Sequence, residues 1–183
     1  MVILMNNINL MSEKEREYPH CHLIQFLCFL GFFMVWILDS FVLNSSTGFS
    51  SLIPLVLRLV VFGIILCTAF AISRSLHNIL LKDGHVKDQR AHKHRPPDQV
   101  VDYGVMAYVR HPLYLAVLLF YLSFVILTIS IISFLVWIII SLVHNKMASF
   151  EETQLITMFN DDYMEYKKRV PKWIPNPLKL IKL

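Results

Sequence analysis

The chain has 183 residues, of which 56% are hydrophobic and only 16% are charged. Soluble domains are about half apolar and about a quarter charged, so this composition excludes an ordinary soluble protein and favours an integral membrane protein. The formal net charge of +4 does not indicate nucleic-acid binding, because the basic residues flank apolar runs. Positive charge at the ends of membrane segments is explained by the positive-inside rule.

Two apolar runs in the N-terminal half predict transmembrane helices. The first covers about residues 20–43, and its part from Cys21 to Leu38 contains no charge. It has the roughly 20 residues that a bilayer-spanning helix needs, and it is too long for the apolar part of a secretory signal. The second covers about residues 51–81, and its part from Ser51 to Ile72 contains one charge, Arg58. An arginine inside a span indicates a functional site, unless it snorkels to the interface or pairs with Asp39, and these alternatives stay open.

The polar segment at residues 82–99 predicts a cytoplasmic loop without a metal site. Its histidines, His85, His92 and His94, have no cysteine or carboxylate at the spacing of metal ligands. The three cysteines of the chain all lie inside apolar runs, where we expect small packing residues. The sequence therefore predicts neither a bound metal nor a disulfide framework.

The third apolar run, residues 113–143, contains no charge and predicts a helical hairpin. As a single helix it would be roughly 46 Å long, which exceeds the hydrocarbon core of about 30 Å. The β-branched and polar patch at Thr128–Ser133 supplies a turn. Basic residues precede and follow the run, whereas residues 44–51 contain none, so a hairpin places both basic groups on the cytoplasmic side. We expect an all-α integral membrane protein with four or five transmembrane helices and both termini inside the cell.

An amphipathic cytoplasmic helix is expected to follow the hairpin, over about residues 150–170. Residues at steps of three or four fall on one face of such a helix, and here they are Glu151, Leu155, Phe159, Asp162 and Tyr166. Pro171 ends the helix, and Trp173 among lysines is typical of an interfacial anchor. The chain thus divides into N-terminal membrane helices at residues 1–81 and a C-terminal core at residues 82–183.

Two polar clusters would meet at one membrane face if the hairpin forms. They are "DQVVDYGVMAYVRHPLY" at residues 98–114 and "FEETQLITMFNDDYMEYKKRVP" at residues 150–171. Convergent polar groups beside an apolar wall are typical of a cofactor pocket, which His111, Tyr114 and Glu151 would line. The structural alternative makes each residue an ordinary feature of a membrane edge: a basic residue, a helix-starting proline and an interfacial tyrosine.

These clusters resemble the C-terminal core of the isoprenylcysteine carboxyl methyltransferase family, over about residues 98–175. In that family a glycine-containing segment leads into Arg-His-Pro-x-Tyr. After a membrane hairpin come Glu-Glu-x-x-Leu and an ending of the form Tyr-x-x-Tyr-basic-Val-Pro. Here these read "GVMAYVRHPLY", "EETQL" and "FNDDYMEYKKRVP". The first motif also occurs in phospholipid N-methyltransferases and sterol reductases, so the combination carries the resemblance, which indicates a short member from a prokaryotic cell membrane.

The resemblance implies an S-adenosylmethionine-dependent methyltransferase that takes a lipophilic acceptor from the bilayer and releases S-adenosylhomocysteine. His111 and the backbone N–H groups of a helix start are expected at the methionine carboxylate, and Glu151 at the ribose or the α-amino group. An acceptor carboxylate is already ionised at neutral pH, so in-line displacement to a methyl ester needs no general base. The cofactor-binding residues carried over by position are Asp98, Gln99, Val100, Val101, Met106, His111, Pro112, Leu113, Tyr114 and Glu151.

Several positions depart from the family pattern. Met106 stands where eukaryotic members have a tyrosine, and Ala116 and Asn160 replace glycines. Met147 matches an arginine that the family associates with the substrate carboxylate, and the adjacent Lys146 is expected to substitute for it. These two residues are therefore the candidate substrate residues.

Two other functions stay open from the sequence. The first is methylation of an amine or phospholipid, for which Glu151, Glu152 or Tyr114 would accept a proton from the acceptor. The second is a non-enzymatic membrane scaffold with a degenerate site. The sequence does not identify the methyl acceptor, the oligomeric state or the role of Arg58.

Overall fold

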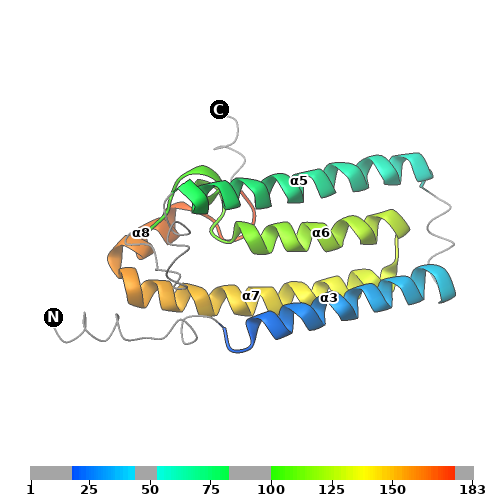
Figure 1. The fold of residues 1–183 in the computed structure, drawn as a ribbon, viewed down its shortest axis with the longest axis horizontal. Coiled ribbons are helices and arrows are strands. Elements are labelled where there is room, and N and C mark those ends of the chain that lie inside the picture. The colour runs from blue at the N-terminus through cyan, green and yellow to red at the C-terminus, as the bar shows by residue number, and fades with distance from the viewer. Residues whose placement is uncertain (1–17, 44–52, 83–99, 176–183) are drawn as a thin grey trace. The chain divides into compact units, whose positions relative to one another are not determined.

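The computed structural model describes residues 18–43, 53–82 and 100–175, and all its regular elements there are helices (Figure 1). Within these described residues, three helical segments are long and apolar enough to cross a membrane, at Cys21–Leu43, Leu55–Leu80 and Ile131–Phe159. The expected all-α membrane fold is thereby confirmed. The elements are α3 (Cys21–Ile37), the π-helical turn η1 (Leu38–Leu43), α5 (Leu55–Lys82), the 3₁₀ turn η2 (Gly104–Ala107), α6 (Pro112–Thr128), α7 (Ile131–Phe159) and α8 (Asp161–Arg169).

The chain forms two compact units. The first, here called the membrane unit, consists of His22–Ser73 and Leu113–Lys146. The second, here called the motif unit, consists of the described parts of Met1–Cys21, Arg74–Pro112 and Met147–Leu183. Each unit combines segments from both sides of residue 82. The division expected from the sequence, into membrane helices at residues 1–81 and a core at residues 82–183, therefore stays a prediction.

The expected hairpin forms from α6 and α7, which are separated only by Ile129 and Ser130 (Figure 1). Ile129 adopts a positive φ of 54°, which reverses the chain immediately after α6. The hydroxyl oxygen of Ser130 then accepts a hydrogen bond from the backbone N–H of Ser133 at 3.0 Å. This is the contact of an N-cap residue with the third residue of its helix. The turn lies within the patch at Thr128–Ser133 and confirms the hairpin over a single long helix.

Polar contacts hold the first span against this hairpin inside the membrane unit. Asp39 of η1 is only 2% exposed, and its carboxylate accepts a hydrogen bond from the hydroxyl of Ser130. The indole N–H of Trp36 donates to the carbonyl of Phe124 at 3.0 Å. Lipid tails are as apolar as leucine, so such interhelical hydrogen bonds and close packing, not water exclusion, hold membrane helices together.

The expectation of one helix over residues 150–170 is wrong. α7 continues to Phe159 and α8 begins at Asp161, because Asn160 has φ 48° and ψ −119°, which no helix contains. Glu151 and Tyr166 therefore lie on different helices and share no helical face. The apolar and polar periodicity continues across the break of one residue, so the pattern alone does not reveal it.

Candidate functional site

The segment before α6 in the motif unit owes its course to Gly104. Gly104 has φ 59°, and a Cβ atom on it would lie 2.5 Å from the Cδ1 atom of Ile79. Only glycine meets both requirements without strain. The 3₁₀ turn that starts at Gly104 then leads to Arg110 and His111, directly before α6 begins at Pro112.

A small apolar core lies beneath these residues in the motif unit. Tyr163, Tyr166 and Val170 are buried together, and Val100 packs against them. The hydroxyl of Tyr166 donates to the carbonyl of Met106 at 2.8 Å. Burial raises the pKa of Tyr166 to about 12, so this hydroxyl stays protonated at neutral pH. The Tyr-x-x-Tyr-basic-Val-Pro ending is thus a packing motif that fixes the segment before α6.

Arg110 joins this ending to α7. Its guanidinium donates to the carbonyls of Lys167 and Val170 at 2.8 and 3.0 Å, and its backbone N–H donates to the carbonyl of Pro171 at 3.0 Å. Its Nη2 also lies 3.0 Å from the Oε1 atom of Glu152. A guanidinium with this many fixed partners orients its neighbours, so Arg110 is more than a basic residue at the membrane edge.

Glu152 is the centre of the polar cluster. Its side chain is buried, with the whole residue 5% exposed, and it contacts three basic side chains. Besides Arg110, these are His111, with Nε2 3.1 Å from Oε1, and Lys167, with Nζ 3.0 Å from Oε2. Buried carboxylates require such partners, because an unpaired one would lose its hydration without compensation. From the sequence, Glu151 is the predicted site residue, and Glu152 is predicted only as a proton acceptor for an amine substrate.

His111 lies between the two glutamates. Its Nε2 faces Glu152, and its Nδ1 is 3.6 Å from the Oε2 atom of Glu151. Burial lowers the pKa of His111, but the hydrogen bonds and charges of Glu151 and Glu152 outweigh burial and raise that pKa above its ordinary value. With a carboxylate near each ring nitrogen, the imidazolium form is favoured, in which both nitrogens are donors.

The accessible side of this cluster carries Glu151, Lys172 and Trp173. The side chain of Glu151 is 34% exposed, in contrast to that of Glu152. The Nζ of Lys172 donates to the hydroxyl of Ser149 at 2.7 Å and lies 5.8 Å from the centre of the Trp173 ring, whose centre is 5.9 Å from that of His111. One face of the motif unit thus offers a carboxylate, an ammonium group and an aromatic ring. The pattern of the sequence indicates only that Lys172 belongs to an interfacial tail.

The structure brings together part of the set predicted from the sequence. His111, Glu151, Val100, Val101 and Met106 all belong to the motif unit, and Pro112 begins α6. Leu113 and Tyr114 belong to the membrane unit, where the buried ring of Tyr114 packs edge-on against His144 with centres 5.4 Å apart. The predicted contact of Tyr114 with His111 and Glu151 therefore stays a prediction. Outside the described residues lie Asp98 and Gln99, together with the loop histidines His85, His92 and His94.

The two candidate substrate residues have opposite environments. Met147 is completely buried, whereas the adjacent Lys146 is exposed. Consecutive residues of a helix point about 100° apart, so Lys146 does not occupy the position of Met147. His144, which the sequence analysis did not single out, is also buried, and its Nδ1 lies 2.9 Å from the carbonyl of Ile140 while its Nε2 has no hydrogen-bond partner.

The chain matches a protein-family model over most of its length. Neither the curated proteins nor the solved structures contain a match to this chain. A family model described as "Protein of unknown function (DUF1295)" matches residues 11–170, which includes both spans of the N-terminal half, the hairpin, and Arg110, His111, Glu151, Glu152 and Lys167 of the polar cluster. That family is associated with steroid 5-alpha reductase-like and membrane methyltransferase-like proteins. The chain therefore belongs to the DUF1295 family.

Proposed function

We propose that the protein transfers a methyl group from S-adenosylmethionine to a lipophilic acceptor at the membrane. The supporting observation is that residues from all three motifs of the resemblance meet in the motif unit. His111 of Arg-His-Pro-x-Tyr contacts both carboxylates of the Glu-Glu pair, and Arg110 holds the C-terminal ending through the carbonyls of Lys167 and Val170. If each motif had only a separate structural role, contact between the three motifs would not be required.

The residues of the accessible face suit this cofactor. S-adenosylmethionine presents an ammonium group, a carboxylate, two ribose hydroxyls, a sulfonium cation and an adenine ring. The ammonium group and the hydroxyls favour a carboxylate partner, and the sulfonium cation and the adenine favour an aromatic face. Glu151 is a partly exposed carboxylate that accepts hydrogen bonds, and Trp173 supplies a ring for stacking or for a cation–π contact. Glu151 and Trp173 would therefore hold the cofactor.

The chemistry of the cofactor is a methyl group bonded to a positively charged sulfur. The chain supplies position and charge: Glu152, held by Arg110 and Lys167, fixes the ring of His111, and His111 in turn orients Glu151. Fixing the reacting groups in line supplies much of the rate of such a displacement. Apolar spans keep an apolar acceptor in the bilayer, where its nucleophile is poorly hydrated.

The acceptor that we propose is a carboxylate, and Lys172 would hold it. Met147 is buried and uncharged, and Lys146 points to another side of α7, so neither places a cation at the position where the family has arginine. Lys172 does place one against α7, through its hydrogen bond to Ser149. The second candidate is an amine acceptor, favoured by the partly exposed carboxylate of Glu151, which is suited to accept a proton.

Saturable binding of labelled S-adenosylmethionine to the detergent-purified protein tests the proposal. We expect Glu151→Gln to weaken binding at least tenfold without loss of folded protein. The matched control is Glu165→Gln, an exposed glutamate of α8, which should bind as the wild type does. Absence of saturable binding to the wild type would refute both enzymatic functions and leave the scaffold.

The product identifies the acceptor class. After incubation of membranes with cofactor labelled in the methyl group, a methyl ester releases labelled methanol under mild base, whereas an N-methyl group does not. We expect base-labile label in the lipid-soluble fraction, reduced in Lys172→Met and largely retained in Lys172→Arg. Label that survives base would replace the carboxylate with the amine acceptor.

A further inference from the structure

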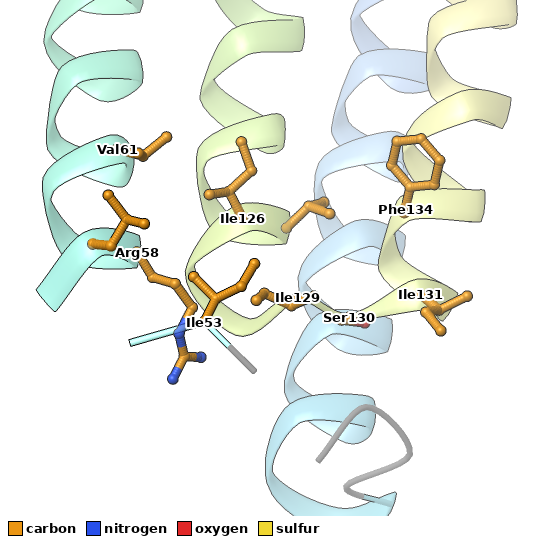
Figure 2. Close-up of a pocket in the computed structure, with 10 residues that line it drawn as sticks. Ile53, Arg58, Val61, Ile126, Ile129, Ser130, Ile131 and Phe134 are labelled. Atoms are coloured by element: carbon orange, nitrogen blue, oxygen red, sulfur yellow. The ribbon is translucent and has the colours of Figure 1, made fainter. Parts of the chain in front are cut away.

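The membrane unit contains a cavity of about 430 Å³ that shares no residue with the polar cluster of the motif unit (Figure 2). Its wall is almost entirely apolar and comes from α5, α6, the hairpin turn and the start of α7, with Leu57, Val61, Ile126, Ile129 and Phe134 among its residues. Two polar side chains line it, Arg58 and Ser130. Ligand pockets in proteins measure about 300–1,000 Å³, so the cavity has the size of a binding site.

Arg58 gives this cavity a positive charge. One guanidinium nitrogen, Nη1, donates to the carbonyl of Leu127 at 3.1 Å. The Nε atom is buried and has no hydrogen-bond partner, and none of the ion pairs among the described residues includes Arg58. Arg58 as a whole is partly buried, and snorkelling of its outer nitrogens into water would still leave the buried Nε without an acceptor.

Asp39, the other suggested partner of this arginine, is engaged at the same cavity wall. Its carboxylate accepts the hydrogen bond of Ser130, whose oxygen also caps α7. The carboxylate of Asp39 is thus hydrogen-bonded to the hairpin turn. The buried Nε of Arg58 therefore lacks an acceptor among the described residues, and an anionic acceptor would also compensate the charge of the guanidinium.

We infer that this cavity binds an anionic phospholipid, with its phosphate on Arg58 and an acyl chain along the apolar wall. Arg58 lies three residues after the start of α5 at Leu55, and the ends of membrane spans lie near the headgroups. A guanidinium matches phosphate oxygens through two parallel hydrogen bonds. Figure 2 shows the guanidinium at one end of the group of apolar side chains, which is the arrangement that a headgroup and its chain require.

Native mass spectrometry of the detergent-purified protein during titration with phosphatidylglycerol tests this inference. We expect one saturable phosphatidylglycerol per chain, with phosphatidylcholine binding at least tenfold more weakly because its headgroup carries a compensating cation. Arg58→Met should weaken phosphatidylglycerol binding at least tenfold, and Arg58→Lys by less. The matched control is Arg74→Met, an exposed arginine of the same helix, which should bind as the wild type does.

A second variant keeps the test decisive if Arg58→Met fails to fold. Val61→Phe retains the arginine and adds volume to the cavity wall, so it should also weaken binding while leaving the helical circular dichroism unchanged. Equal binding by Arg58→Met and Arg74→Met would overturn the inference. So would equal affinity for phosphatidylcholine, or oleate saturating the site in place of phosphatidylglycerol, because each removes the anionic phosphate from the recognition.

Discussion

The central role of Glu152 makes a quantitative prediction about stability. Glu152→Gln keeps the shape of the side chain and removes its charge. Three cations then lose their shared anion: Arg110 at 3.0 Å, His111 at 3.1 Å and Lys167 at 3.0 Å. The first two side chains are buried with Glu152, whereas Lys167 is 38% exposed and recovers hydration from solvent.

The size of the loss follows from the two buried partners. Removing one member of a buried ion pair costs roughly 3–5 kcal/mol, because a charge remains buried without compensation. The amide oxygen of glutamine still accepts one hydrogen bond, and His111 can release its proton, so we expect the low end, about 3 kcal/mol. For a chain of this length, 1 kcal/mol shifts Tm by about 2–4 °C, which gives a decrease of roughly 6–12 °C.

Thermal unfolding in detergent, followed by helical circular dichroism, measures this decrease. Glu165→Gln makes the same chemical change on the exposed surface of α8 and should shift Tm by at most about 1 °C. If Glu152→Gln and Glu165→Gln shift Tm equally, the cluster contributes no more than a surface charge and the reasoning fails. The same result would also contradict the proposal that Glu152 holds the ring of His111 in one orientation.

Three further changes test other parts of the structure. Because the pKa of His111 is raised on folding, the stabilisation from its charge is complete below pH 6.5 and is lost as pH rises through the raised pKa. The Tm of the wild type should thus fall between pH 6 and 9 more steeply than that of His111→Phe, and parallel profiles would contradict this. Asn160→Gly should raise stability by about 1 kcal/mol, since relief of the strained φ exceeds the entropy that glycine adds to the unfolded chain, whereas Asn160→Ala should not. Ser130→Ala should lower stability by about 2 kcal/mol, because it removes the cap of α7 and the donor to buried Asp39, and a loss no greater than that of Ser141→Ala would argue against both roles.

The spans and the hairpin could be predicted because a bilayer imposes lengths that the sequence must meet. A charge-free run too long for one span has to turn, and the patch at Thr128–Ser133 is where it does. The break at Asn160 could not be predicted in the same way. A single residue with positive φ leaves the spacing of apolar residues almost unchanged, and asparagine carries less of a signal for that conformation than glycine does.

Contacts between residues far apart in the sequence could be predicted only in part. The contact between His111 and Glu151 was expected because the hairpin joins the segments that carry them. Lys172 was missed, since its position against Ser149 depends on the course of the chain after α8. Arg58 was recognised as an unusual residue, but its cavity depends on three segments that no periodicity relates.

The difference between Glu151 and Glu152 shows how far adjacent residues of one motif can diverge. In the sequence they are equivalent acids, yet one is partly exposed and the other is buried among three cations. If the buried glutamate orients and the exposed one binds, their glutamine variants must fail in different assays. Glu151→Gln should lose cofactor binding at nearly wild-type Tm, whereas Glu152→Gln should lose Tm first. Loss of both properties in both variants would mean that the pair acts as one structural unit, and the accessible carboxylate would then have no separate role in binding.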